Sequence, residues 1–177
     1  MRLAFLAILL SLGLVVAAVA YGGRQAAVCH VSTLYGLPGP DDADGCTPGD
    51  FDPLAPYTRA DGTTVTTKEQ VCDGSDRPTL RAADKREVLG EYGETHWTKE
   101  DGEIDHRQPL FLGGLTTPDN LWPEPGGIPN AKDRVEFRAY RMVCFADPFS
   151  ITVRYARRLF TSDWRLAYET WKAEGIL

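Results

Sequence analysis

One histidine of the chain has a carboxylate directly beside it. The chain contains three histidines, His30, His96 and His106, and of these His106 follows an aspartate, Asp105. A neutral imidazole, with an ordinary pKa of about 6.5, can take a proton from water at physiological pH. A carboxylate is a hard oxygen ligand that suits a divalent metal ion. The pair therefore predicts water activation beside a metal, whereas His30 and His96 are predicted to be exposed to solvent.

The position of the pair in a strand decides whether both side chains can act at one place. Adjacent residues of a strand point to opposite faces, unless the strand ends or twists there. The segment Glu103–His106 is predicted to be a short strand that ends at His106. An end at this position would bring the carboxylate and the imidazole to one site.

Short strands and several helices must position this pair. Apolar spacing, capping residues and chain breakers predict a helical turn at 66–71, helices at 81–92, 130–144, 150–160 and 162–173, and a second strand at 120–122. Asn130 and Ser162 are the predicted N-caps of the helices at 130–144 and 162–173. The Pro- and Gly-rich segment 123–129 is predicted to break the chain. Trp164, Tyr168 and Trp171 recur at helical spacing and are predicted to be core. The fold class is therefore α+β with very little strand.

The residues around the pair extend into a longer pattern. Pro109-Leu110 and Leu112-Gly113-Gly114 follow it, and Asn120 stands fourteen residues after His106. This pattern resembles the HNH, or ββα-metal, endonuclease motif. The likeness to a subgroup of small secreted HNH-like proteins covers about Cys46 to Trp171. It includes Cys46-Thr47-Pro48-Gly49, Val71-Cys72, Glu91-Tyr92-Gly93, Asn120-Leu121-Trp122-Pro123-Glu124-Pro125, Ala131-Lys132-Asp133-Arg134-Val135-Glu136 and Val143-Cys144.

The resemblance implies a fold and a role for each matching residue. Two short strands and a helix, forming a small ββα core with additional helices, clamp one divalent ion. Asp105 is then a metal ligand and His106 is the general base for phosphodiester hydrolysis. Asn120 belongs to the catalytic motif, and its side chain ties the loop between the strands. The helix supplies the second ligand, for which Asn130 and Asp133 are both candidates.

The same resemblance implies a cofactor and a substrate. Mg²⁺ is the expected ion because the proposed ligands are oxygens, and Mn²⁺ and Zn²⁺ stay open. Nucleic acid is the expected partner, DNA before RNA, with little sequence specificity because no base-reading element is visible. The phosphates are expected to contact Arg107, Lys132, Arg134 and Arg138. Oligomeric state is left open.

The charge distribution partly favours such a partner. The net charge is −6, but the charges are unevenly distributed. Residues 130–177 carry nine basic and six acidic residues, whereas residues 21–129 carry nine basic and nineteen acidic residues. The basic excess therefore lies at the C-terminal end, where it could hold phosphates.

The first twenty residues predict export. Arg2 precedes an apolar run, Leu3–Ala20, that closes with the small-x-small pattern Ala18-Val19-Ala20. A cleaved secretory signal is one reading, and an uncleaved anchor is the other because the run just reaches a spanning length. Contact with a membrane is expected only in the second case. Both place the remaining chain outside the cytoplasm, as a secreted or periplasmic protein.

The cysteine count fits the same compartment. Cys29, Cys46, Cys72 and Cys144 follow the leader, and an even number in an oxidising compartment predicts two disulfides. Three pairings are open. The resulting domain plan is a signal peptide or anchor at 1–20, an irregular linker or loop segment at 21–56, and an HNH-like nuclease domain at 57–177.

Two other interpretations compete with a metal-dependent nuclease. The first is a secreted binding or scaffold module that keeps the HNH shape without the chemistry, which the acidic balance favours. The second is a disulfide-stapled surface module unrelated to nucleic acid, which leaves the pattern from Asp105 to Glu136 to chance.

Overall fold

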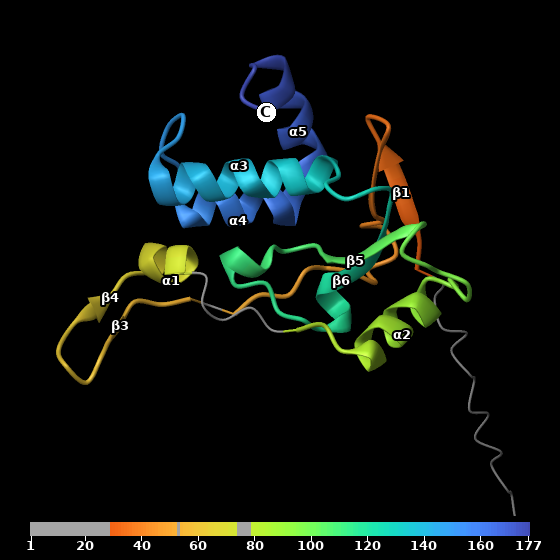
Figure 1. The fold of residues 1–177 in the computed structure, drawn as a ribbon, viewed down its shortest axis with the longest axis horizontal. Helices are drawn as coiled ribbons and strands as arrows, with labels where there is room; N and C mark the ends of the chain where they lie inside the picture. Colours follow the sequence, from red (N-terminus) through yellow and green to blue (C-terminus); the bar gives the residue numbers. More distant parts are fainter. Residues whose placement is uncertain (1–28, 53, 74–78) are drawn as a thin grey trace, which may run out of the picture.

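The computed structural model describes residues 29–52, 54–73 and 79–177. These residues form three two-stranded antiparallel sheets and five α-helices, an α+β fold in which the strands are short. The strands are β1 (Val31–Leu34), β2 (Leu37–Pro40), β3 (Tyr57–Thr58), β4 (Thr64–Val65), β5 (Gly102–His106) and β6 (Leu121–Pro125). The helices are α1 (Thr67–Asp73), α2 (Ala82–Glu91), α3 (Ala131–Phe145), α4 (Val153–Ser162) and α5 (Trp164–Ala173). Figure 1 shows α3, α4 and α5 in an upper group, with the β5–β6 hairpin, α1 and α2 beneath it.

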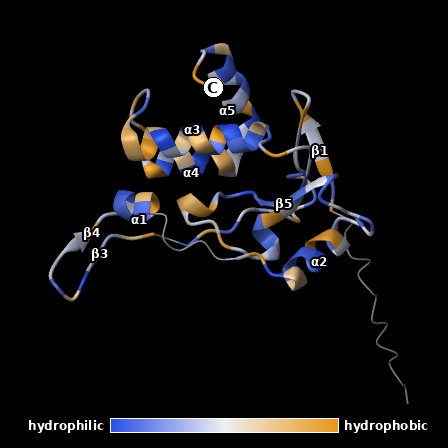
Figure 2. Ribbon diagram, in the orientation of Figure 1, coloured by the Kyte–Doolittle hydropathy of each residue, from blue (hydrophilic) through white to orange (hydrophobic). Residues whose placement is uncertain are grey.

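The larger of two apolar cores lies among α1, α3, α4 and α5. Its buried residues are Val71, Leu112, Val135, Ala139, Met142, Val143, Ala156, Phe160, Trp164, Ala167 and Trp171. Apolar and polar residues are mixed along α3 and α4 in Figure 2, because each helix turns one face toward this core and the other to solvent. The predicted aromatic residues Trp164 and Trp171 are buried here, and Cys72–Cys144 joins α1 to α3.

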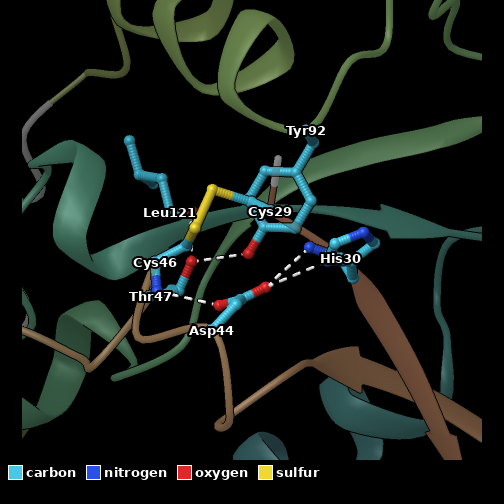
Figure 3. The surroundings of a disulfide bond; sticks show 7 residues. All are labelled: Cys29, His30, Asp44, Cys46, Thr47, Tyr92 and Leu121. Atoms are coloured by element: carbon cyan, nitrogen blue, oxygen red, sulfur yellow. Dashed lines mark hydrogen bonds and ion pairs between the residues drawn. A yellow bond between two sulfur atoms is a disulfide. The ribbon is translucent and has the colours of Figure 1, made fainter. Parts of the chain in front are cut away.

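The smaller core lies between α2 and β6. It contains Cys29, Val88, Tyr92, Leu121 and Trp122. The disulfide Cys29–Cys46 closes this core on one side (Figure 3). The two disulfides therefore resolve the three pairings that the sequence leaves open, and they indicate an oxidising, extracytoplasmic environment.

The described part of the segment predicted to be an irregular linker, residues 29–52 and 54–56, is folded onto the rest of the protein. It contains the β1–β2 hairpin. Thr47 lies at the smaller core, where its hydroxyl is 2.6 Å from the Tyr92 hydroxyl (Figure 3). Further along, the Gly49 N–H donates to the Asp119 carbonyl and the Asp52 N–H to the Gly113 carbonyl. Backbone hydrogen bonds to distant segments hold this segment in place. No local sequence pattern predicts such bonds.

Most predicted elements are confirmed, with shifts at their ends. The helix predicted at 81–92 is α2, the strand at 103–106 is β5, and Asn130 caps α3 as predicted. Asp163 caps α5 in place of the expected Ser162, since its Oδ1 accepts the Arg165 N–H at 3.0 Å. His30 and His96 are exposed, as expected.

The strand β6 runs through prolines that were expected to break the chain. The Arg107 N–H donates to the Asn120 carbonyl at 2.8 Å, which sets the register of the hairpin. Backbone groups alternate between facing the partner strand and facing away. Pro123 and Pro125 therefore occupy positions that need no N–H toward β5, and an edge strand tolerates them.

Among the described residues, none of the helices is long and apolar enough to cross a membrane. The leader predicted at residues 1–20 lies outside the described residues.

Candidate functional site

The hairpin β5–β6 and the first turns of α3 bring the chemically active side chains together. Asp105 pairs with Trp122 and His106 with Leu121 across the hairpin. Directly opposed residues share a face of a sheet, and consecutive residues do not. Gly102 begins β5 with φ of 154°, and a Cβ there would lie 1.9 Å from the Glu124 carbonyl oxygen. The close pairing of the two strands therefore depends on glycine at this position.

The loop between the strands is tied by Asn120. Its Oδ1 accepts the Gln108 N–H at 2.7 Å, and its Nδ2 donates to the carbonyls of Gln108 at 3.1 Å and Leu115 at 2.8 Å. A Cβ on Gly114 would lie 1.9 Å from the Gln108 carbonyl oxygen, so glycine permits this close packing. Asn120 is fully buried and makes the loop tie that the HNH resemblance implies for it.

His106 lies at the end of β5, facing the tied loop. Its Nε2 is 3.0 Å from the Thr116 hydroxyl, and the residue is 8% exposed. Burial lowers the pKa of His106 below its ordinary value, the Asp105 carboxylate opposes this shift, and the Lys132 ammonium adds to it. The imidazole is therefore neutral at pH 7, the state that a general base requires.

Asp105 turns to α3 and forms an ion pair there. The Lys132 ammonium donates to Asp105 Oδ2 at 2.5 Å and also to Glu136 Oε1, one turn further along α3. The Lys132 side chain is 0% exposed, whereas those of Asp105 and Glu136 are 18% and 24% exposed. Asp105 and His106 thus have separate partners, the first on α3 and the second in the loop.

Glu124 completes a group of carboxyls around Lys132. We call Asp105, Glu124 and Glu136 the acid cluster. Glu124 is 2% exposed, and its Oε2 has no hydrogen-bond partner among the described residues. Burial first, and then hydrogen bonding to Asp105, raise the pKa of Glu124 to about 10. Glu124 is therefore a neutral carboxylic acid at pH 7.

The remaining members of the cluster share the charge of Lys132. Burial alone would lower the pKa of Lys132 and raise that of Asp105. Burial is the largest single effect on each group, but the charges and hydrogen bonds around them together outweigh it. The Asp105 and Glu136 carboxyls raise the Lys132 pKa, and the Lys132 charge with hydrogen bonds from Glu124 and Lys132 lowers the Asp105 pKa. Burial raises the pKa of Glu136 to about 7, despite the ammonium beside it. At neutral pH the cluster contains the ion pair between Lys132 and Asp105 and the neutral Glu124 carboxyl.

Asn130 and Asp133, the two candidates for the second metal ligand, form the capping box of α3. The Asn130 side chain accepts the Asp133 N–H at 2.9 Å, and Asp133 Oδ2 accepts the Asn130 N–H at 2.8 Å. Asn130 Nδ2 also donates to Glu103 Oε1 at 3.3 Å. Their oxygens are therefore engaged with the helix end rather than with Asp105.

This arrangement does not fit the expected metal ion. Within the described part of the chain, no three His, Cys, Asp or Glu side chains are placed to hold one. The nearest approach to a ligand set is the acid cluster, and the Lys132 ammonium contacts two of its three members. Dependence on Mg²⁺, Mn²⁺ or Zn²⁺ stays a prediction.

The four cations expected to contact phosphate divide into two pairs. Arg107 is buried, where its guanidinium donates to the carbonyls of Thr47 and Thr161 and pairs with Asp42. Lys132 is buried in the acid cluster. Because Arg107 and Lys132 are buried, their side chains are not accessible to a phosphate as the sequence analysis expected. Arg134 is exposed and lies over the Tyr168 ring, and Arg138 is half-buried on the same helix.

Other cations gather at a cavity of about 850 Å³ that sequence reasoning did not identify. Its lining includes Lys68, Arg154, Arg157 and Arg158, and no acid is among the lining residues that the structure describes. Arg157 Nε donates to the Leu112 carbonyl at 2.8 Å, which connects the cavity wall to the loop that follows His106. A lining that combines apolar side chains with four cations, and no acid among its described residues, suits an anionic ligand.

Sequence reasoning also missed the burial of Lys132, although a signal for it exists. Lys132 falls at helical spacing with Val135, Ala139 and Val143, all of them buried. The burial of Glu124 had a weaker signal in the sequence. This acid stands between Pro123 and Pro125, in a segment that was predicted to break the chain.

No family model, curated protein or solved structure matches this chain. The resemblance to HNH endonucleases therefore rests on the residue pattern itself.

Proposed function

We propose that this protein hydrolyses phosphodiester bonds of nucleic acid at an HNH-type site, with His106 as the general base. The observation that carries the proposal is the position of His106. It ends β5, faces a loop that Asn120 ties, and has its pKa lowered by burial. A strand end, a tied loop and a helix that begins beside Asp105 are the parts that the resemblance implies for an HNH core.

His106 has one role in the proposed reaction, which is to accept a proton from the attacking water. The neutral imidazole takes a proton from water while the water oxygen bonds to phosphorus. The bond from phosphorus to the leaving sugar oxygen breaks, and that oxygen takes a proton from solvent. A positioned general base contributes about 10²–10⁴-fold to such a rate.

The substrate class follows from charge. The cavity with Lys68, Arg154, Arg157 and Arg158, whose described lining contains no acid, supports binding of phosphates close to the loop that follows His106. Arg134 and Arg138 offer a second, more exposed pair on α3. Contacts of this kind hold a phosphate backbone without reading bases, so we propose low sequence specificity, with DNA before RNA.

We further propose that the protein is secreted or periplasmic. The apolar run at residues 3–20 and the two disulfides support export. If the run is retained, it would anchor the protein to a membrane.

Cleavage assays test the function. The purified, oxidised protein is incubated with supercoiled plasmid, single-stranded DNA or RNA, in Mg²⁺, Mn²⁺, Zn²⁺ or EDTA. His106→Ala is expected to cut at least about a hundredfold more slowly. His96→Ala, which changes an exposed histidine, is the matched control and is expected to cut normally. Equal cutting by the His106→Ala variant would remove the role assigned to this residue. The metal and EDTA lanes measure the expected metal dependence separately.

A second candidate function is a secreted, non-catalytic binding module of HNH-like shape. The ion pair between Lys132 and Asp105 favours it, because the carboxylate expected to hold a metal is already neutralised. No cutting of any substrate by the unmodified protein, in any lane, would select this candidate.

A further inference from the structure

The cavity lined by residues of α1 and α4 combines two kinds of side chain. Its volume is about 850 Å³, within the range of roughly 300–1,000 Å³ that is usual for pockets that hold a small ligand. Aliphatic side chains, among them Leu54, Ile151 and Val153, form part of its wall. Lysine and arginine side chains form another part. A ligand that suits both has an apolar portion and a negatively charged portion.

The cations of this cavity have no carboxylate partner. They are Lys68 of α1 and, at i, i+3 and i+4 spacing on one face of α4, Arg154, Arg157 and Arg158. None of the four forms an ion pair among the described residues, whereas Arg165 on the next helix pairs with an aspartate. All but Arg157 are exposed. The cavity is therefore a local positive region of an acidic protein, free to bind an anion from solution.

Arg157 and an aromatic ring form a fixed part of the wall. Arg157 Nε donates to the Leu112 carbonyl at 2.8 Å, and its Nη2 donates to the Asp52 carbonyl at 2.9 Å. Its guanidinium lies 4.8 Å from the centroid of the Phe51 ring. Phe51 is 38% exposed, and its backbone forms a β-bridge to Gly114 in the loop between β5 and β6. A ring and a cation are thus held beside the loop that follows β5.

We propose that this cavity holds an unpaired nucleotide of single-stranded nucleic acid. The base would lie against Phe51 and the aliphatic wall, and the neighbouring phosphates would contact the exposed cations. The inference rests on the proposed function for the class of ligand, and it adds that a base enters the cavity. Proteins commonly bind single strands in this way, with aromatic side chains under the bases and cations along the backbone.

The apolar wall favours a single strand over two other anionic ligands. The bases of a duplex are stacked and paired, so a duplex could offer only its backbone to the cations and would leave the wall uncovered. A lipid has an apolar chain but carries its charge at one end. Cations that belong to two separate helices suit a strand with several phosphates better than one headgroup.

The first test measures binding separately from cleavage. The full, oxidised protein with His106→Ala is titrated in EDTA into labelled oligonucleotides of equal length, and Kd is obtained from fluorescence anisotropy. The probes are a single strand, the corresponding duplex and an abasic strand that keeps the phosphates without the bases. The single strand is expected to bind at least about tenfold more tightly than either, because stacking of one base contributes about this factor or more. Charge alone would favour the duplex, which has the higher charge density.

The variant Arg154→Gln/Arg158→Gln, in the same His106→Ala background, assigns the binding to the cavity. Neither arginine side chain makes a hydrogen bond or ion pair within the described residues, so the fold should be unchanged. The slope of log Kd against log salt concentration should fall by about 1.4, since each phosphate contact on a single strand contributes about 0.7. Arg86→Gln/Lys99→Gln removes the same charge at exposed positions outside the cavity and should leave the slope nearly unchanged.

Equal affinity for the single strand and the abasic strand, or tighter binding of the duplex, would overturn the inference. An unchanged salt slope in the Arg154→Gln/Arg158→Gln variant would do the same. Binding of anionic phospholipid vesicles but of no oligonucleotide would mean that the cavity holds an acyl chain instead. Cleavage by the protein with His106 intact is scored separately. Preference for single strands without any cutting would contradict the proposed function alone, and cutting without that preference would contradict this inference alone.

Discussion

At the scale of single residues, the acid cluster separates three carboxyls of similar chemistry into different charge states. Asp105 is ionised because Lys132 is close, whereas burial keeps Glu124 neutral. The neutral Glu124 carboxyl can donate a hydrogen bond to the Asp105 carboxylate, which stabilises that charge without adding a second one. The cluster therefore needs one cation rather than three.

Glutamine in place of Glu124 should make the protein more stable at neutral pH. The unfolded chain loses the Glu124 proton near the ordinary value of 4.5, while the folded protein keeps it up to a pKa of about 10. Folded Glu124 thus binds more protons than unfolded Glu124 between these values, and the free energy of unfolding falls as pH rises. Glutamine does not titrate, so Glu124→Gln removes this loss. The free energy of unfolding at pH 7 is expected to increase by up to about 3 kcal/mol.

Urea unfolding at several pH values measures this effect. The variant and the unmodified protein should differ little at pH 4.5 and diverge steadily toward pH 8. Glu94→Gln, at an exposed position, should show no such divergence. A difference that is constant with pH would mean that Glu124 is ionised in the folded protein.

At the scale of elements, local patterns located the helices and the hairpin, and long-range contacts decided the rest. The capping signal at Asn130 and the apolar stripe of α3 were sufficient to place that helix. The β1–β2 hairpin was missed because Leu37-Pro38-Gly39-Pro40 has the composition of a loop. Arg165 on α5 helps to hold it, with Nη1 3.1 Å from the Ser32 hydroxyl, and no pattern in the sequence predicts a contact across 133 residues.

In the candidate site, too, the contacts within one hairpin were predicted and the contact with a distant helix was not. Asp105, His106 and Asn120 belong to one hairpin with its loop, as expected. The ion pair between Asp105 and Lys132 was not predicted. The helical spacing of Lys132 with Val135 indicates that Lys132 is buried, but not which acid it contacts. That contact depends on how α3 packs against β5, which the spacing within α3 does not determine.

The loop tie yields a prediction for the β5–β6 element. Asn120→Ala would leave the Gln108 N–H and two carbonyls without their partner. Each buried group that loses its hydrogen bond costs about 1–3 kcal/mol, so a loss of about 3 kcal/mol or more is expected. Asn130→Ala, which removes a helix cap instead, should cost about 1 kcal/mol.

Chemical denaturation of both variants decides this point. In Asn120→Ala, the resonances of Thr116 and His106 should also shift, since the tie positions the loop that faces the imidazole. Equal stability of the two variants would mean that Asn120 is dispensable to the loop.

At the scale of the whole molecule, the two disulfides contribute unequally. Cys29–Cys46 spans 17 residues and Cys72–Cys144 spans 72. In the chain-entropy account, loops of these lengths stabilise a protein by about 3 and about 4 kcal/mol. The longer one also joins α1 to α3 at the larger core.

Replacing each cysteine pair with serine or alanine tests this ranking. The Cys72/Cys144 variant is expected to lose about 4 kcal/mol, and the Cys29/Cys46 variant about 3 kcal/mol. Thermal unfolding with and without dithiothreitol provides the measurement, and the reductant should have no further effect on a variant without either disulfide. A larger loss at Cys29/Cys46 would mean that the smaller core dominates stability.

The crosslink between α1 and α3 also bears on when the fold becomes complete. Small domains are stable by about 5–15 kcal/mol in total, so a newly made chain that still has thiols lacks a large share of that stability. An oxidising compartment supplies it. If the protein is the exported nuclease proposed above, complete folding would be delayed until the genome of the producing cell is out of reach.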